Sequence, residues 1–213
     1  MAWPIWPKKT VKYHSTPQGI LTESGVWYKT TIQHLNDYAG DLFDQEPLDV
    51  YLALADTWIR SPYTISLWLL PFGILSYDLF QWSVIVLSFF LIWQIIAPAL
   101  VNRTLSPLLK LLDAVLMQAL LYAVTMSILA MSGRYDALAV GLLGFILFRW
   151  GILSYLTRPI VTFCWKTMYT LPAPDHILRA FIIRGALRNG ITLADFEDIE
   201  RKVAEQITKK KST

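Results

Sequence analysis

The chain has 213 residues, of which 54% are hydrophobic and only 16% are charged, whereas a soluble globular domain usually carries about 25% charged residues. A soluble fold of this length cannot hide so much apolar surface, so the composition excludes a disordered chain, a disulfide-stapled secreted module and an ordinary cytosolic enzyme. The net charge of +3 is too small to indicate a nucleic-acid partner. The composition predicts an integral membrane protein that has membrane lipids among its partners.

Hydropathy divides the chain into three zones along the sequence. Residues 1–60 are polar and mixed, residues 61–157 are almost continuously apolar, and residues 158–213 are polar again. In that order, we expect a cytoplasmic or interfacial N-terminal region, a transmembrane bundle, and an interfacial segment followed by a cytoplasmic helical hairpin.

The N-terminal region is expected to be extended up to residue 25 and then helical. Three prolines and two glycines lie within residues 1–25, whereas apolar residues recur at helical spacing in 26–43 and again in 48–59. The second of these helices has an apolar face that includes Trp58. Such a helix either lies in the membrane interface with its tryptophan at headgroup depth or packs on the protein's own bundle.

The apolar zone divides into four candidate spans. They approach the roughly 20 apolar residues that a spanning helix needs and comprise residues 63–77, 82–101, 108–131 and 136–156. The first is short and contains Pro71 and Gly73, so a re-entrant hairpin is the alternative to a full span. The connections are short, which forces antiparallel neighbours. The expected fold is an all-α, polytopic, four-span antiparallel bundle.

The distribution of basic residues predicts the orientation of this bundle. An even number of spans places both termini on one side of the membrane. That side carries five basic residues near the membrane, Arg60, Arg103, Lys110, Arg158 and Lys166, whereas the other side carries only Arg134. Lys and Arg concentrate in cytoplasmic loops, so we expect a multi-pass protein with both termini in the cytoplasm.

Four polar residues inside the predicted spans are the candidate functional residues, because ionisable and strongly polar groups are rare and costly there. They are Gln94, Asp113, Gln118 and Arg149. Asp113 and Arg149 lie at similar depth on antiparallel neighbours, so we predict an intramembrane ion pair, in direct contact or bridged by one water. Gln118 and Gln94 mark a candidate polar pathway.

Residues for catalysis, cofactors or metals are not evident. The three histidines, His14, His34 and His176, lie outside the predicted spans, which disfavours axial haem ligands within the bundle. The chain has a single cysteine and lacks HExxH, P-loop and GxSxG patterns. We therefore expect no enzymatic activity, no metal and no cofactor. Gly141 and Gly144 form a small-residue pair that we interpret as a packing site within the chain, with dimerisation as the alternative.

The C-terminal zone is predicted to form a helical hairpin that binds a partner. Its final helix carries an apolar stripe of Phe196, Ile199, Val203 and Ile207. Residues 187–202, with Gly190-Ile-Thr followed by Asp195-Phe-Glu, resemble the SHOCT type of short C-terminal domain, with one residue fewer before the threonine and Asp in place of the usual Glu. The resemblance implies oligomerisation or binding of another macromolecule and implies no catalysis.

Together these features predict a non-enzymatic accessory or scaffolding subunit that assembles with itself or with other membrane subunits. Two cytoplasmic amphipathic regions need cover for their apolar faces, and no convergent polar site of the kind that a catalyst needs is evident. The alternative is an oligomeric channel or a transporter of ions or small solutes that uses Asp113, Gln118 and Arg149.

Overall fold

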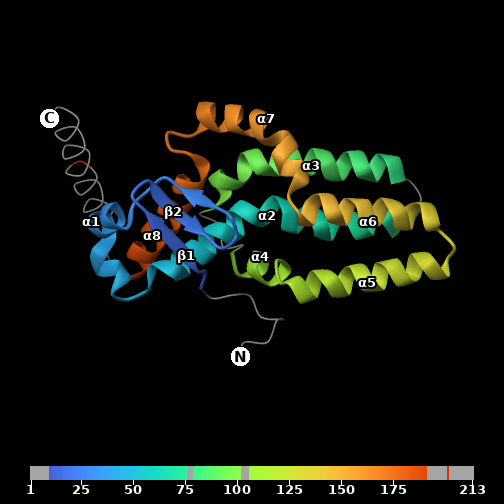
Figure 1. The fold of residues 1–213 in the computed structure, drawn as a ribbon, viewed down its shortest axis with the longest axis horizontal. Helices are drawn as coiled ribbons and strands as arrows, with labels where there is room; N and C mark the ends of the chain where they lie inside the picture. Colours follow the sequence, from blue (N-terminus) through green and yellow to red (C-terminus); the bar gives the residue numbers. More distant parts are fainter. Residues whose placement is uncertain (1–9, 76–78, 102–105, 191–200, 202–213) are drawn as a thin grey trace. The chain divides into compact units, whose positions relative to one another are not determined.

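The structure, a computed structural model, describes residues 10–75, 79–101, 106–190 and 201 and divides them into two compact units. Thr57–Pro172 forms one, which we call the bundle unit; the described residues of Lys9–Asp56 and Ala173–Thr213 form the other, which we call the sheet unit. Helices dominate both (Figure 1). The predicted helical character is confirmed, and three short strands are an addition that the sequence did not predict.

The sheet unit begins with a three-stranded antiparallel sheet in the order β1-β2-β3. The strands are β1 (Tyr13–Thr16), β2 (Gly19–Thr22) and β3 (Trp27–Tyr28). Gly25 has φ of +83°, a left-handed conformation that glycine adopts without strain, and its N–H donates to the carbonyl of Thr22 at 2.9 Å. The segment that was expected to be merely extended therefore turns back and pairs with itself.

Three helical segments complete the sheet unit: α1 (Ile32–Phe43), the first nine residues of α2 (Leu48–Leu75) and α8 (Ala173–Arg188). Thr31 caps α1 by accepting the N–H of His34 at 3.2 Å. Side chains from the sheet and the helices share one core, which includes Ile20, Tyr28, Leu42, Leu52, Ile177 and Ile182. The first and last zones of the sequence thus fold together.

A buried carboxylate joins the strands to α2 in the sheet unit. The hydroxyl of Tyr28 donates to Asp56 at 2.6 Å, and Ser24 donates to the same carboxylate. Burial first, and then the neighbouring charge of Asp56, raises the pKa of Tyr28 well above its ordinary value, so the phenol keeps its proton. At the end of β3, the N–H of Lys29 donates to Asp175 at 2.9 Å and ties the sheet to the start of α8.

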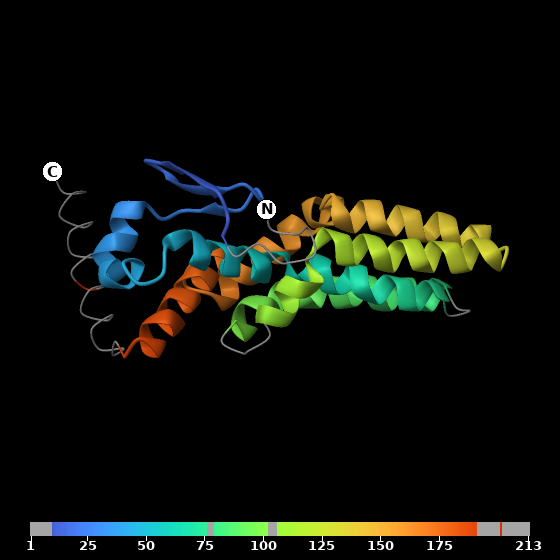
Figure 2. The same ribbon diagram turned by 90° about the horizontal axis from the view of Figure 1, so that it is seen from below.

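The bundle unit consists of the rest of α2 together with α3 (Leu79–Leu100), α4 (Ser106–Leu112), α5 (Val115–Met131), α6 (Tyr135–Arg149) and α7 (Ile152–Met168). Figures 1 and 2 show α2, α3, α5 and α6 running side by side, and α7 packs against α3. The arrangement agrees with the expected helical bundle.

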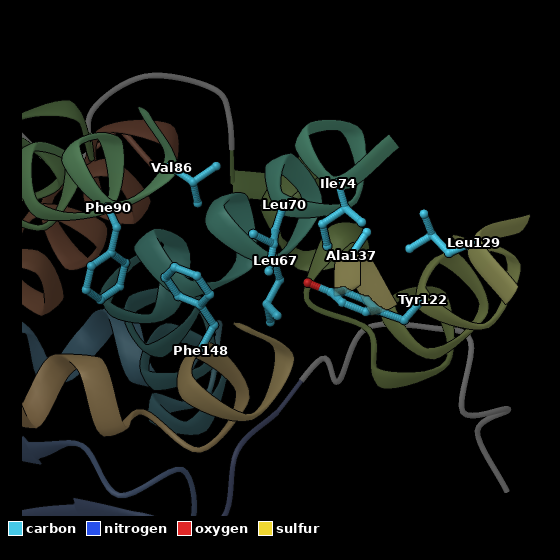
Figure 3. Packing of buried hydrophobic residues seen from close by; sticks show 9 residues of the cluster. All are labelled: Leu67, Leu70, Ile74, Val86, Phe90, Tyr122, Leu129, Ala137 and Phe148. Atoms are coloured by element: carbon cyan, nitrogen blue, oxygen red, sulfur yellow. The ribbon is translucent and has the colours of Figure 1, made fainter. Parts of the chain in front are cut away.

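The bundle's apolar core draws on four helices (Figure 3). Its members are Leu67, Leu70 and Ile74 of α2, Val86 and Phe90 of α3, Tyr122 and Leu129 of α5, and Ala137 and Phe148 of α6. The rings of Phe90 and Phe148 meet edge to face, with their centroids 5.2 Å apart, an arrangement that aromatic pairs prefer. This core fixes the side-by-side packing of the long helices.

Three helix boundaries differ from the sequence-based prediction. The segments 48–59 and 63–77 were predicted as separate, but α2 runs through Pro62 without interruption. The predicted helix 108–131 breaks after Leu112, and the predicted helix 136–156 breaks at Gly151, whose φ is +69°. A left-handed glycine commonly ends a helix, and α7 then continues at a bend of 56° from α6.

Only part of the bundle meets the length and hydropathy expected of a membrane span. Among the described residues, α3 alone is long and apolar enough by itself, and α6 and α7 qualify together as a bent pair. The helix α5 is apolar but shorter, with 17 residues. One or two helices of the described chain are therefore able to cross a membrane by this criterion.

Candidate functional site

Helix α5 places polar side chains on its inner face and apolar side chains on its outer face. Its buried residues include Gln118, Tyr122 and Thr125. Its outer face is a row of large apolar side chains, namely Val115, Leu116, Leu120, Val124 and Ile128. This arrangement is the reverse of a surface helix in a soluble protein. The amide of Gln118 and the hydroxyl of Thr125 donate to carbonyls within the protein, whereas the buried hydroxyl of Tyr122 has no hydrogen-bond partner among the described residues.

The break between α4 and α5 is held by side chains from two helices. Ala114 has an extended conformation, with φ of −63° and ψ of 123°, which frees the carbonyl of Leu112 from the helical ladder. The indole N–H of Trp68 donates to this carbonyl at 2.9 Å, and the amide of Gln118 donates to it at 3.2 Å. The polar group of Gln118 is thereby satisfied within the protein, as a buried amide must be.

Asp113, the residue at this break, is held by α2. Arg60 Nη1 lies 3.3 Å from one carboxylate oxygen of Asp113, and the hydroxyl of Thr64 donates to the other at 2.8 Å. The direct partner of Asp113 is thus Arg60, which replaces the predicted contact with Arg149. The physical reason is the continuity of α2 through Pro62: it places Arg60 and Thr64 one turn apart on a single helical face.

Arg149 lies in the last turn of α6, beside the second helix break. It is half-buried and makes no hydrogen bond or ion pair of its own with any residue that the structure describes. Its charge acts on Asp113 more weakly than that of Arg60 does. The structure therefore brings Asp113 and Arg149 to the same region without joining them.

Gln94 takes part in a contact between α3 and α7. Pro98 has no N–H and leaves the carbonyl of Gln94 without its helical donor; the indole of Trp165 donates to that carbonyl at 3.1 Å. The side-chain amide of Gln94 donates to the hydroxyl of Thr157 at 3.1 Å. Gln94 and Gln118 thus have separate partners within the protein, each next to a distortion of a helix.

At Pro62 of α2, a side chain likewise donates to the carbonyl that the proline leaves without a donor. The proline leaves the carbonyl of Trp58 without a helical donor, and the hydroxyl of Ser61 donates to it at 2.7 Å. Ser61 in turn accepts the indole N–H of Trp93 from α3 at 2.9 Å. At both prolines, an indole or a hydroxyl thus replaces the missing backbone donor, and tryptophan indoles form hydrogen bonds between neighbouring helices.

The two glycines of α6 face the interior of the bundle. A methyl group added at Gly144 would overlap the side chain of Leu70, and one added at Gly141 would overlap Met126 and approach Ile74 to 3.0 Å. These glycines allow α6 to approach α2 and α5 closely, which agrees with a packing role inside the chain.

Other predicted site residues fall elsewhere. Phe196, Ile199, Val203 and Ile207, and most of the SHOCT-like stretch, lie outside the described residues. Within the described ranges, no three His, Cys, Asp or Glu side chains come together as a metal site would require.

The residues of α2 that hold Asp113 and Leu112 were not among the predicted site residues. Arg60, Thr64 and Trp68 recur at intervals of four, and this spacing was the signal that could have identified a polar row on one helical face. Arg60 had been considered only as a marker of membrane orientation.

Comparison with known proteins adds no relative: no family model, no curated protein and no solved structure matches this chain.

Proposed function

We propose that this chain is a non-enzymatic integral membrane protein that acts as an accessory or scaffolding subunit of a larger membrane assembly. The observation that carries the proposal is the outer surface of the bundle unit, on which large apolar side chains are exposed, while the buried amides of Gln94 and Gln118 bind partners inside the chain. Only a lipid environment or protein partners would keep such a surface out of water.

The exposed apolar surface is extensive. Phe80 is 79% exposed, Met131 is 89% exposed and Phe163 is 69% exposed, and only 28% of the apolar stretch of α3 is buried inside the protein. Removing one such side chain from water stabilises by about 1.5–3 kcal/mol. More than a dozen exposed apolar side chains on α3, α5, α6 and α7 would therefore strongly favour a membrane over water.

Four spans fit this surface, supplied by the second part of α2, by α3, by α5 and by α6. The 17 residues of α5 extend about 26 Å, close to the roughly 30 Å of a bilayer's hydrocarbon core. The helix breaks that follow α6 and precede α5 would then lie near the cytoplasmic boundary of the membrane, with both termini in the cytoplasm, as the distribution of basic residues predicts.

A scaffolding role is supported by the way in which the bundle uses its polar groups. Asp113, Gln118 and Gln94 are all directed at partners inside the chain, whereas a catalyst would direct such groups at a substrate. The sheet unit offers apolar surface for contacts, since Leu21 and Trp27 are opposite each other on neighbouring strands and both are exposed. The SHOCT-like segment would add an oligomerisation element.

The proposal is tested by membrane extraction, topology and assembly size. Carbonate extraction should leave the chain in the membrane pellet. In a Cys164→Ser background, Gln18→Cys should react with an impermeant thiol reagent only after the cells are opened, and Ser132→Cys should react in intact cells. Removal of residues 191–213 should leave the bundle folded but reduce the mass of the native assembly in mild detergent. A monomer of unchanged size before and after the deletion would contradict the scaffolding role.

A channel or small-solute transporter is the second candidate function. It is favoured by two broken helices, α4–α5 and α6–α7, with Asp113 and Arg149 beside the breaks, because discontinuous helices form the ion and substrate sites of many transporters. Purified chain reconstituted in vesicles would separate the two functions: ion or solute flux that falls on Asp113→Asn substitution supports transport, and vesicles that stay tight support the scaffold.

A further inference from the structure

Positive charge exceeds negative charge at the level of the two helix breaks. Arg60 and Thr64 of α2 hold Asp113 at the first break. Tyr63, between them in sequence, packs beside Gly151 at the second break, where an added methyl group would lie 3.9 Å from its ring. The same turn of α2 therefore touches both breaks and brings them to one level of the bundle.

Three basic side chains belong to this level, but the only acidic side chain that the described structure places there is already paired. Arg60 neutralises Asp113 directly. Arg149 and Lys110 are half-buried, and neither makes an ion pair or a side-chain hydrogen bond within the described chain. Lys110 lies three residues before Asp113, on the adjoining turn. Arg149 and Lys110 are thus each left without a paired anion among the described residues.

The surroundings of Arg149 are those of a membrane boundary. Trp150 is 74% exposed and Tyr155 is 76% exposed, and such aromatic side chains concentrate at the level of lipid headgroups. Arg149 ends a helix of 15 residues, about 22 Å from its far end. In a hydrocarbon core of roughly 30 Å, its guanidinium would lie just below the headgroups and within reach of them by extension of the side chain.

We propose that Arg149 binds the phosphate of an anionic phospholipid at the cytoplasmic boundary of the bundle. The proposal rests on the membrane location proposed above. A guanidinium presents paired N–H donors that match phosphate oxygens, and the exposed apolar side chains of α5 and α7 would accommodate the acyl chains. The lipid phosphate then supplies the negative charge that Arg149 does not find among the described residues.

The test is native mass spectrometry of the full chain in mild detergent, titrated with phosphatidylglycerol and, separately, with phosphatidylcholine. The wild-type chain should retain phosphatidylglycerol in preference. Arg149→Gln should weaken that retention by about tenfold, as expected for loss of a hydrogen bond between charged groups. Arg158→Gln is the matched control, because Arg158 is an exposed cation on α7 outside the proposed site, and it should retain the lipid as the wild type does. Arg149→Lys keeps the charge and should retain an intermediate amount.

The outcomes separate this site from the membrane proposal. Equal retention of both lipids, or equal losses for Arg149→Gln and Arg158→Gln, would overturn the lipid site while carbonate extraction still reports membrane insertion. Displacement of phosphatidylglycerol by an equal concentration of inorganic phosphate would mean that the site takes a soluble anion, which also overturns the proposal. Recovery of the chain in the soluble fraction after carbonate treatment would overturn the membrane location instead. Unchanged thermal stability of each variant establishes that a loss of lipid reflects the site and not the fold.

Discussion

The ion pair between Asp113 and Arg60 allows a quantitative test of what holds the α4–α5 break. Asp113→Asn removes the charge and keeps an oxygen that accepts from Thr64, so the substitution isolates the ionic contribution. The side chains of Arg60 and Asp113 are 33% and 18% exposed, between a surface pair, worth about 0–1 kcal/mol, and a fully buried pair, whose disruption costs about 3–5 kcal/mol. We expect each single substitution, Asp113→Asn or Arg60→Gln, to destabilise by about 2 kcal/mol.

The double variant decides whether the two residues act on each other. Asp113→Asn combined with Arg60→Gln leaves no unpaired charge, so its destabilisation should fall short of the sum of the single effects by about 1 kcal/mol. Unfolding in mixed detergent micelles, followed by the fluorescence of the nine tryptophans, measures these free energies. In a thermal assay, each single variant should lower Tm by roughly 4–8 °C for a chain of this size.

A second cycle, with Arg149→Gln in place of Arg60→Gln, is the control for this argument. Because Arg149 acts on Asp113 only at longer range, its coupling to Asp113→Asn should be below about 0.5 kcal/mol. Coupling to Arg149 larger than coupling to Arg60 would refute the pairing described above and restore the partner that the sequence had suggested.

Three further substitutions test other features of the fold. Gly144→Ala would force a methyl group against Leu70 and should destabilise the bundle by about 1–3 kcal/mol without changing the mass of the assembly; a changed mass would favour an intermolecular role for this glycine. Trp165→Phe leaves a buried carbonyl without a donor and should cost about 1–3 kcal/mol in the same unfolding assay. Burial, with a smaller contribution from a nearby arginine, lowers the pKa of His176 below 6.5, so the fold favours neutral imidazole; its stabilising effect is present above pH 6.5 and is lost as the pH falls through the lowered value. The drop in Tm between pH 7.5 and pH 5 should therefore be smaller in His176→Gln than in the wild type, whereas the exposed control His14→Gln should behave as the wild type does.

Much of the architecture follows from local patterns in the sequence. The apolar zone and the helical content depend on periodicity and composition, which neighbouring residues of one segment carry by themselves. Gln94 and Gln118 were singled out by the same local reading, as strongly polar groups in apolar stretches, and were predicted to mark a polar pathway. In the structure both side chains are buried and donate hydrogen bonds within the chain, and the polar pathway remains a prediction.

Partners and helix breaks depended instead on tertiary structure. The sequence predicted Arg149 as the partner of Asp113, whereas the structure pairs Asp113 with Arg60. This pairing follows because α2 remains helical through Pro62, where the hydroxyl of Ser61 replaces the missing hydrogen bond. The sequence did not reveal that Gly151 would adopt the left-handed conformation that ends α6, because a glycine within an apolar stretch can also continue a helix. The sheet could not be predicted from local patterns either, because its short strands are stabilised by a core that they share with α1 and α8.

The physical reason for this division is the range of the interactions. Hydrophobic periodicity and capping act within a few residues, so they can be read directly from the chain. An ion pair between residues 60 and 113, or a hydrogen bond from Trp165 to a carbonyl of α3, joins segments whose proximity is set by the packing of whole helices. The sequence by itself determined which residues need partners, and the tertiary structure decided which partners they have.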